Sequence, residues 1–349
     1  MTAIKAYAAY DAETPLKPFE FERKDVGPNQ IQIDILYSGV CHSDIHTAKG
    51  DWGPAIYPLV PGHEIVGRIV KIGSDVTKFK IGDLAGVGCF VDSCRTCNNC
   101  KEGVEQYCDE GMTGTYNSYQ RGTDIPTYGG YSTSITVDEK YSLHISDKLP
   151  LQGVAPLLCA GITTYSPLKY CKVGKGHKIG VLGLGGLGHM AVKFAAAFGA
   201  EVTMLSGTPS KEEDAKKLGA HHFALTSNPD TMNSLLNSFD FILNTVSGSH
   251  DYNQYMNLLR TNGTMIVVGA PPTPAEIPAF TLIMKRRSIM GSMIGGIAET
   301  QEMLDYCAEH GIVSDVEVIN MDYINEAYVR MDKSDVKYRF VIDMASLKS

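Results

Sequence analysis

The sequence lacks the features of an exported or membrane-spanning chain. Its first ten residues, M-T-A-I-K-A-Y-A-A-Y, contain no basic start, unbroken apolar stretch or cleavage signature, so we expect a cytoplasmic protein. The longest apolar stretch, residues 179–200, holds six glycines together with His189 and Lys193. That composition favours a strand, a glycine turn and a buried helix over a membrane span.

Positive charge is also scarce. The chain has 31 Lys plus Arg against 39 Asp plus Glu, a net charge of −8, which disfavours binding to nucleic acid or to anionic membranes. The compact basic run at residues 285–287 needs no polyanion, because a solvated face or strand flank explains it. With 44% hydrophobic and 20% charged residues over 349 positions, the chain is expected to fold into two domains.

The pattern of residues changes along the chain. The first 150 residues are punctuated by Gly and Pro and carry short β-type runs at 30–35 and 65–72, which predicts an irregular, mostly β domain. From about Leu151, apolar strand-like runs alternate with helical segments and predict a parallel sheet. These runs are residues 178–182, 201–205, 239–243 and 264–268, and a helix near 299–310 and a last strand at 338–342 follow.

Four cysteines form the strongest local motif. Cys94, Cys97, Cys100 and Cys108 have the spacing C-x2-C-x2-C-x7-C, and such short spacings let one loop direct several thiolates at one ion. An odd total of nine cysteines and the tight clustering favour metal ligation over disulfides. We expect a closed structural zinc site. An iron–sulfur cluster has overlapping spacing and stays open as an alternative, as do free thiols.

A second group of metal-ligand types lies upstream. The segment from Cys41 to His46 reads C-H-S-D-I-H, and Gly62 precedes His63 and Glu64. A thiolate, an imidazole and carboxylates can form an open zinc site with one position left for water or substrate. Each residue alone has an ordinary explanation, since single histidines are mostly not ligands and a single cysteine can be a small buried apolar residue.

A glycine motif, G-L-G-G-L-G at 183–188, follows the predicted strand 179–182 and precedes the predicted helix through Phe198. In this context glycines permit a tight turn and close approach of a pyrophosphate to the backbone, and the helix N-terminus attracts its charge. The motif predicts a dinucleotide site; a turn that is rich in glycine for packing alone is the alternative.

The next strand indicates which dinucleotide binds. An NAD site places an acidic residue at the end of that strand, but here the strand ends in Ser206, Gly207 and Thr208, with Lys211 shortly after. Glu201 stands at the beginning of the strand, the wrong end for the ribose. Hydroxyls, backbone amides and an ammonium suit a 2′-phosphate, so NADP(H) is expected.

Together these motifs resemble the zinc-containing medium-chain alcohol dehydrogenases, most closely the cinnamyl alcohol dehydrogenase branch with its bacterial aldehyde reductases. The resemblance implies an α/β fold with a GroES-like, mostly β catalytic domain (residues 1–155 and 297–349) and a doubly wound parallel-sheet Rossmann domain (156–296). Besides the cysteine loop, the resemblance rests on the motifs G-V-C-H-S-D at 39–44, P-G-H-E at 61–64, L-L-C-A-G-I-T-T-Y-S-P-L at 157–168, the glycine motif, G-S-M-I-G-G at 291–296 and Y-R-F-V-I-D at 338–343.

The resemblance also assigns roles near the metal. It makes Cys41, His63 and Cys159 the catalytic zinc ligands, with Glu64 beside the metal, entering or leaving its coordination sphere. Asp44 is then the partner that holds the His63 ring. The alternatives are a loop salt bridge for Glu64 and a turn-capping role for Asp44. Ser43 begins a proton path that leads through the cofactor ribose toward His46. These implied roles give two zinc ions per chain, one catalytic and one structural.

Further residues are assigned to the cofactor and the substrate. The pyrophosphate is implied to contact Gly183, Gly185, Gly186, Leu187 and Gly188, and the 2′-phosphate Ser206, Gly207, Thr208 and Lys211. The nicotinamide end is implied to be lined by Thr163, Thr245, Val268, Ser292 and Ile294. Arg339 is implied to pair with phosphate, and a surface ion pair is the alternative for this residue. The implied walls of the substrate pocket are Trp52, Pro54, Cys89, Phe90 and Met112, with core packing the competing explanation for Cys89 and Phe90.

The expected function is hydride transfer between NADPH and aromatic or medium-chain aliphatic aldehydes, by a homodimer that binds small molecules only. Two alternatives stay open. An NAD-dependent zinc polyol or amino-alcohol dehydrogenase would need an acidic residue at the end of the second strand. A non-catalytic, zinc-stabilised nucleotide-binding protein would have no need of a metal with a vacant position.

Overall fold

The computed structural model describes residues 2–348, and they form two compact units. One unit comprises the residues up to Ile162 together with those from Gly295 onward, and the other is Thr163–Ile294. The first division falls inside helix α4 (Ala160–Tyr170). Within residues 2–348, no helix has the length and apolar character needed to cross a bilayer.

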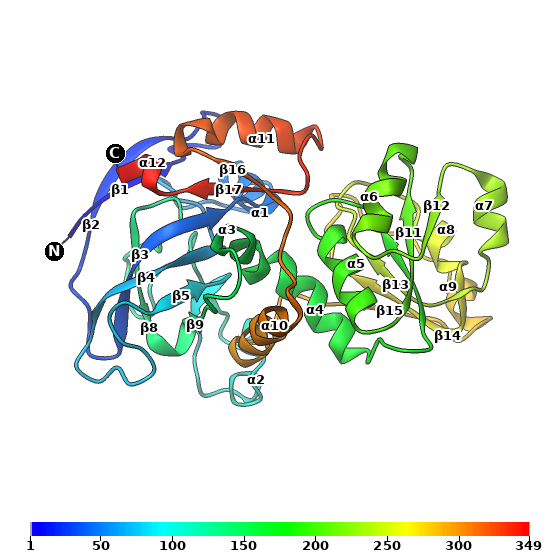
Figure 1. Cartoon of the computed structure of the whole chain (residues 1–349), viewed down its shortest axis with the longest axis horizontal. Coiled ribbons are helices and arrows are strands. Elements are labelled where there is room, and N and C mark those ends of the chain that lie inside the picture. Colours follow the sequence, from blue (N-terminus) through cyan, green and yellow to red (C-terminus); the bar gives the residue numbers. More distant parts are fainter. Residues whose placement is uncertain (1, 349) are drawn as a thin grey trace. The chain divides into compact units, whose positions relative to one another are not determined.

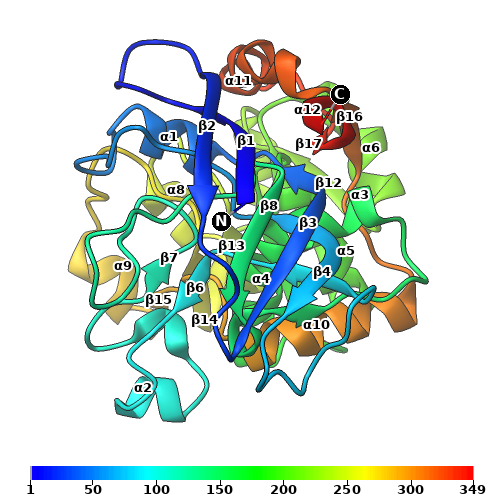
Figure 2. The same cartoon turned by 90° about the vertical axis from the view of Figure 1, so that its left-hand side faces the viewer.

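The first unit is built on a seven-stranded sheet. Its strands run in the order β16-β17-β3-β4-β5-β9, and β8 pairs with β3 off this path. Figure 2 shows β8, β3 and β4 side by side. Their bounds are β3 Gln30–Gly39, β4 Ile65–Ile72, β5 Leu84–Val87, β8 Ser134–Asp138, β9 Leu143–His144, β16 Val316–Ile319 and β17 Arg339–Asp343. The alternating isoleucines of β3 are fully buried, so the central strand faces the core, as its alternation predicts.

Smaller elements surround this sheet. Two further pairs of strands are β1 (Thr2–Ala8) with β2 (Lys17–Arg23) and β6 (Phe90–Asp92) with β7 (Thr113–Gly114). The helices are α1 His42–Ala48, α2 Asn98–Lys101, α3 Leu151–Val154, α10 Ile297–His310, α11 Ile324–Asp332 and α12 Ala345–Lys348, and the 3-10 turns are η1 Glu105–Tyr107, η2 Glu139–Tyr141, η3 Ala155–Leu158 and η5 Met321–Tyr323. The expected helix near 299–310 is α10.

Strand register places distant residues at one edge of the sheet. The antiparallel pairing of β3 and β4 sets Ser38 opposite Ile65, so the residues after β3 and before β4 meet. Strand β17 pairs with the same end of β3, where the Val40 amide donates to the Phe340 carbonyl at 2.9 Å. Turn η3 packs over β3, β4, β5 and β17. Cysteine, histidine and arginine side chains from four parts of the sequence therefore converge here.

The second unit has a six-stranded parallel sheet in the order β12-β11-β10-β13-β14-β15 (Figure 1). The strands are β10 Lys178–Leu182, β11 Glu201–Ser206, β12 His222–Leu225, β13 Phe239–Asn244, β14 Leu259–Val267 and β15 Ser288–Gly291. The helices are α5 Gly188–Ala197, α6 Glu212–Lys217, α7 Pro229–Ser234, α8 Tyr252–Met256 and α9 Ala279–Ile283, with the 3-10 turn η4 Pro209–Lys211. Strand order reverses beside β10, the point at which such sheets bind ligands. The predicted doubly wound fold is confirmed.

The turn between β10 and α5 depends on glycine at separate positions for separate reasons. Gly183 has φ +91°, a conformation that side-chain-bearing residues rarely adopt. A Cβ on Gly188 would overlap the Gly183 carbonyl oxygen, so the helix start can pack this closely only without a side chain. By contrast, a Cβ on Gly185 would meet nothing within 4 Å. The backbone at Gly185 is therefore open to a ligand, as a dinucleotide site requires.

Candidate functional site

Four metal-ligand types meet in the interior of the first unit. One ligand atom from each of Cys41, His63, Glu64 and Cys159 lies within 4.8 Å of the other three, and all four residues are buried. Cys41 is the N-cap of α1, His63 and Glu64 directly precede β4, and Cys159 follows η3. Two sulfurs, an imidazole and a carboxylate are zinc ligands in chemistry and in number. The structure thus brings together the four residues that the resemblance places at the catalytic zinc.

The carboxylate of Asp44 ties two of these ligands together. Its Oδ2 accepts from the Cys41 amide at 2.9 Å, and its Oδ1 accepts from the Gly62 amide at 3.1 Å. The same Oδ1 lies 3.0 Å from His63 Nδ1, which leaves the other ring nitrogen for a metal. Tyr131 adds a hydroxyl that donates to Oδ2 at 3.2 Å. Asp44 is fully buried, so these donors replace water around its charge.

Charge is concentrated in the cluster. The Cys159 thiol donates a hydrogen bond to Cys41 and, against the opposing effect of burial, lowers the pKa of Cys41 well below its ordinary value. The pKa of Cys159 is raised in turn by that interaction with Cys41. Burial opposes a charged His63 ring, yet the negative charge of Asp44 raises the pKa of His63 well above its usual range. Such groups readily exchange protons for a cation.

Glu64 has one oxygen engaged and one without a partner. Burial raises its pKa to about 8, although the Arg339 guanidinium acts in the opposite direction through an ion pair with Oε1. Within residues 2–348, Oε2 is buried with no hydrogen-bond partner. A Cβ at Gly39 would overlap Oε2, so the last residue of β3 leaves room for this carboxylate. An unpartnered buried oxygen among three metal ligands fits a cation-binding site.

Arg339 is found in this cluster. Its side chain is buried, its Nη2 pairs with Glu64, and its Nη1 lies 3.7 Å from Cys41 Sγ. The structure shows this guanidinium paired with a residue of the metal-ligand cluster, and its expected contact with a cofactor phosphate stays a prediction. The reason is topological: β17 pairs with the end of β3 that leads into Cys41.

Ser43 and His46 lie on α1 beside the cluster. Cys41 Sγ is 3.5 Å from Ser43 Oγ, and both Ser43 and His46 are half-buried. Their spacing of three residues puts them on one face of the helix. The His46 ring is held by Asp51, at 2.8 Å from Nδ1, and stacks on Trp52 with centroids 5.0 Å apart. His46 therefore has a fixed position between the site and solvent.

The expected pocket walls differ in burial. Trp52 and Pro54 are exposed, Cys89 and Met112 are half-buried, and Phe90 is buried with its ring edge-on to Tyr141. Cys89 lies close enough to Cys159 to raise the pKa of that thiol, which places it at the metal cluster. Their contact with substrate stays a prediction; for Phe90 the structure shows core packing.

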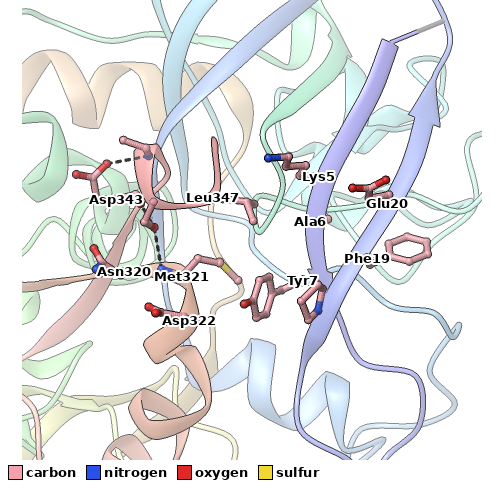
Figure 3. Close-up of a pocket in the computed structure, with 13 residues that line it drawn as sticks. Lys5, Ala6, Tyr7, Phe19, Glu20, Asn320, Met321, Asp322, Asp343 and Leu347 are labelled. Atoms are coloured by element: carbon pink, nitrogen blue, oxygen red, sulfur yellow. Dashed lines mark hydrogen bonds between the residues drawn. The ribbon is translucent and has the colours of Figure 1, made fainter. Parts of the chain in front are cut away.

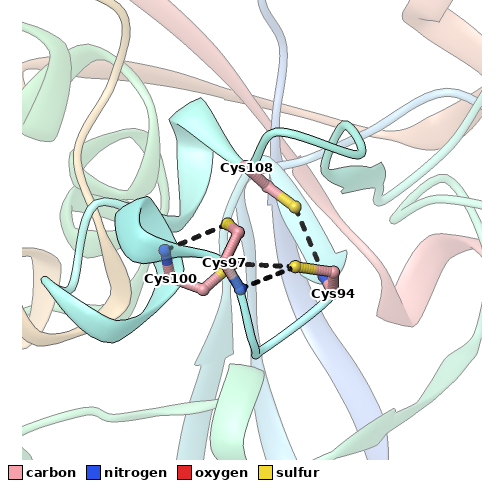
Figure 4. Close-up of side chains that lie close together, drawn as sticks. All are labelled: Cys94, Cys97, Cys100 and Cys108. Atoms are coloured by element: carbon pink, nitrogen blue, oxygen red, sulfur yellow. Dashed lines mark hydrogen bonds between the residues drawn. The ribbon is translucent and has the colours of Figure 1, made fainter.

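The four cysteines of the C-x2-C-x2-C-x7-C motif converge in the loop around α2 (Figure 4). Their sulfurs lie within 4.8 Å of one another, and backbone amides point at them: Cys97 N donates to Cys94 Sγ and Cys94 N to Cys108 Sγ, both at 3.3 Å. The amide of Thr96 lowers the pKa of Cys94 to about 6, whereas burial raises that of Cys100 to about 12. The loop is thus folded for four thiolates around one ion.

Comparison with known proteins agrees with this geometry. Residues 27–147 match the family described as "Alcohol dehydrogenase GroES-like domain", and residues 186–309 match "Zinc-binding dehydrogenase". The chain is 57% identical over 350 residues to the "NADP-dependent alcohol dehydrogenase C 1" of Mycolicibacterium smegmatis, covering 100% of both chains. It belongs to the zinc-dependent alcohol dehydrogenase family.

Two further relatives support the assignment to this family. The "Aldehyde reductase YahK" of Escherichia coli is 56% identical over 346 residues, covering 99% of both chains. Among solved structures, a cinnamyl alcohol dehydrogenase of Sorghum bicolor aligns with TM-score 0.95 and 45% identity over 99% of this chain and 98% of that one. The expected family and two-domain fold are therefore confirmed.

In the nucleotide-binding unit of this alcohol dehydrogenase, the residues after β11 lie beside the glycine turn. The Lys211 ammonium donates to the Leu184 carbonyl at 2.9 Å, and the Thr208 amide donates to Ser206 Oγ at 3.2 Å. Glu201 is engaged elsewhere, 3.0 Å from His222, at the opposite end of β11. A cation and hydroxyls thus stand where a ribose 2′-substituent is bound in such folds.

The residues expected at the nicotinamide end have mixed roles. The Thr245 hydroxyl donates to the Leu182 carbonyl at 2.8 Å and holds the glycine turn. The Ser292 amide donates to the Val267 carbonyl at 3.1 Å, and Ile294 has φ +38°. Thr163 is buried on α4, and Val268 follows β14. Contact of these residues with the cofactor stays a prediction.

A separate hollow of about 660 Å³ lies between the β1–β2 pair and the C-terminal residues (Figure 3). It is lined by charged and apolar side chains that include Lys5, Phe19, Glu20, Asp322 and Leu347. None of the expected site residues lines it. The chemistry therefore does not belong to this hollow.

Sequence reasoning missed Tyr131 and Gly39, which act on Asp44 and Glu64. A tyrosine in G-G-Y and a glycine at a strand end carry no ligand signature. The position of Tyr131 follows from the fold alone, because the 129–131 loop is hydrogen-bonded to the loop before His63. Non-local pairing of this kind is not visible in residue spacing.

We predict that Cys97→Ser lowers the zinc content from two ions per chain to one and lowers the melting temperature by at least about 5 °C, because the loop loses a ligand whose binding energy is folding energy. Metal analysis and thermal unfolding provide the measurements. Cys171→Ser, outside both clusters, is the control. Two zinc ions and an unchanged melting curve in Cys97→Ser would contradict the structural site.

Proposed function

We propose that this alcohol dehydrogenase contains two zinc ions per chain and transfers hydride between NADP(H) and aromatic or medium-chain aliphatic aldehydes and alcohols. The observation that supports this proposal most directly is the gathering of Cys41, His63, Glu64 and Cys159 within 4.8 Å in the interior. Relatives named for NADP-dependent alcohol dehydrogenase and aldehyde reductase activities agree with it. A family described as zinc-binding favours zinc over an iron–sulfur cluster in the cysteine loop.

The residues divide the chemical work. Cys41, His63 and Cys159 hold the catalytic zinc, Glu64 lies beside it, and Asp44 fixes the ring of His63. When bound, zinc supplies Lewis-acid polarisation of the substrate oxygen, and the dinucleotide supplies the hydride. The burial of all four ligand residues keeps bulk water from the metal and strengthens electrostatic effects there.

A proton must reach the substrate oxygen as the aldehyde becomes an alcohol. Ser43, half-buried beside Cys41 Sγ, donates its hydroxyl proton to that oxygen. His46, whose ring is oriented by Asp51 and reaches solvent, is the residue that would return a proton to Ser43, and the bound cofactor would supply ribose hydroxyls for that transfer. In the oxidation direction the same groups carry the proton outward.

Cofactor selection rests on the end of β11. Lys211 and the hydroxyls of Ser206 and Thr208 bind a 2′-phosphate, and the glycine turn at Gly185 leaves the backbone open to the pyrophosphate. This arrangement favours NADPH over NADH, and with it aldehyde reduction in the cell. The cytoplasm is the expected location, since none of the nine cysteines forms a disulfide, six of them lie in the two metal-ligand clusters, and such thiols suit a reducing compartment.

A homodimer is the proposed assembly. Strand β15 ends the parallel sheet, and within residues 2–348 its outer edge pairs with no other strand. Beside it, Phe280, Ile283 and Met284 are each exposed by two thirds or more, and Ile289 of β15 is also exposed. An open strand edge with an apolar margin is a typical surface for a second copy of the chain.

For the catalytic site, we predict that His63→Ala lowers the rate of aldehyde reduction by about a thousandfold or more. Removing the imidazole takes away a zinc ligand, and the stabilisation of the transition state by bound zinc is worth several kcal/mol. Steady-state kinetics with benzaldehyde and NADPH measure the loss, and fluorescence titration shows retained NADPH binding. His310→Ala, an exposed histidine on α10, should behave as wild type. Wild-type turnover in His63→Ala would refute the assignment.

For the cofactor site, Lys211→Glu is expected to raise KM for NADPH by about tenfold to a hundredfold, the equivalent of one charge-assisted hydrogen bond, and to change KM for NADH far less. Kinetics with both dinucleotides test this. The matched charge reversal Lys217→Glu, on exposed α6, should change neither value. Equal effects of Lys211→Glu on the two cofactors would argue against a 2′-phosphate contact.

For the assembly, Ile289→Asp should convert a dimer to a monomer in sedimentation velocity, because a charge at the strand edge opposes its pairing. Ile81→Asp changes an equally apolar exposed residue in the other unit and should leave the dimer intact. A wild-type chain that sediments as a monomer, or a dimer unaffected by Ile289→Asp, would exclude this interface.

A further inference from the structure

Asp44 receives four hydrogen bonds, and three of them come from the ligand segments themselves. The donors are the amide of Cys41, the amide of Gly62 and the ring of His63. The fourth donor, the hydroxyl of Tyr131, is 87 residues away in the sequence and is not part of any metal motif. It shares Oδ2 with the Cys41 amide, whereas the other two donors share Oδ1.

The position of Tyr131 is fixed from several sides. Its amide donates to the Pro61 carbonyl at 3.0 Å, and its carbonyl accepts from the Tyr7 amide at 3.0 Å. The side chain is fully buried, and its ring lies so close to Gly62 that a Cβ there would come within 2.8 Å of it. The hydroxyl is therefore held in place before any metal binds. This backbone frame also links it to the turn that carries His63.

The hydroxyl remains a donor at every working pH. Burial, and then the charge of Asp44, raise the pKa of Tyr131 well above its ordinary value. A second buried tyrosine, Tyr328 of α11, has its hydroxyl 3.5 Å from that of Tyr131. In this contact the Tyr328 hydroxyl is the donor and the Tyr131 oxygen accepts, so the Tyr131 proton is left to donate to Asp44. Hydrogen bonds to a buried carboxylate are stronger than those between neutral groups.

We propose that Tyr131 is a positioning residue for the catalytic zinc: its hydroxyl fixes the Asp44 carboxylate, which in turn orients the His63 ring and the Cys41 backbone. Without the hydroxyl, Oδ2 keeps a single donor, the Cys41 amide, and the carboxylate is held less firmly in its orientation. The ring of His63 then loses part of its fixed orientation toward the metal. This inference rests on the zinc site of the proposed function.

The test uses Tyr131→Phe in the full-length zinc protein. The change removes one oxygen and keeps the buried ring. Tyr57→Phe is the matched control, because its hydroxyl donates to the Ala48 carbonyl of the same helix α1 at 2.8 Å without touching Asp44. Zinc release into an excess of a coloured chelator is followed for both variants, together with thermal unfolding and the visible spectrum of the cobalt(II)-substituted protein.

We expect Tyr131→Phe to release one of its two zinc ions roughly threefold to tenfold faster than wild type, somewhat less than the effect typical of a direct partner of a ligand. The other zinc ion should leave at the wild-type rate, the cobalt(II) bands should shift, and the melting temperature should change little. Tyr57→Phe should match wild type in all these measurements.

Three outcomes would overturn the inference. Equal release rates and equal cobalt(II) spectra in wild type and Tyr131→Phe would show that the hydroxyl does not act on the metal. Faster release of both zinc ions with a lowered melting temperature, or the same acceleration in Tyr57→Phe, would show a general loss of stability. A wild-type chain that holds only the zinc of the cysteine loop would refute the proposed function as well, and so distinguishes the two failures.

Discussion

One buried carboxylate holds the catalytic centre together. Asp44 stands in the first turn of α1 and accepts from the amide of Cys41, in the manner of an N-terminal capping box. The same carboxylate accepts from the amide of Gly62 and faces the ring of His63. Helix capping and ligand orientation are thus a single interaction. A buried charge is stable at this position because these donors and the Tyr131 hydroxyl take the place of water.

Strand register explains why those donors are available. Antiparallel pairing brings the end of β3 next to the start of β4, and β17 joins the same edge, so that Cys41, Glu64 and Arg339 are neighbours. A shift of one residue in this pairing would direct their side chains to the opposite face. The irregular loops that carry the ligands are therefore positioned by a regular sheet. The fold supplies rigidity, and the loops supply the chemistry.

Local motifs could be predicted from the sequence, whereas long-range contacts could not. The cysteine loop and the glycine turn are each encoded within about twenty residues, and the structure gathers them as their spacing indicates. Cys159 shares no spacing with Cys41 and was assigned only through family resemblance. Arg339 and Tyr131 join the cluster through strand pairing and loop contacts. Such contacts depend on the whole first unit, so residue order alone carries no sign of them.

The cofactor site and the metal site also differ in how well they tolerate amino-acid substitutions. Gly207 has ordinary backbone angles, and a Cβ there would meet only Thr226 Oγ1 at 3.6 Å, a normal contact. A side chain can therefore be placed at position 207 without disturbing the sheet, and Gly207 belongs to neither metal cluster. The preference for one dinucleotide over the other can therefore evolve by single substitutions after β11, while the residues around the catalytic zinc stay unchanged.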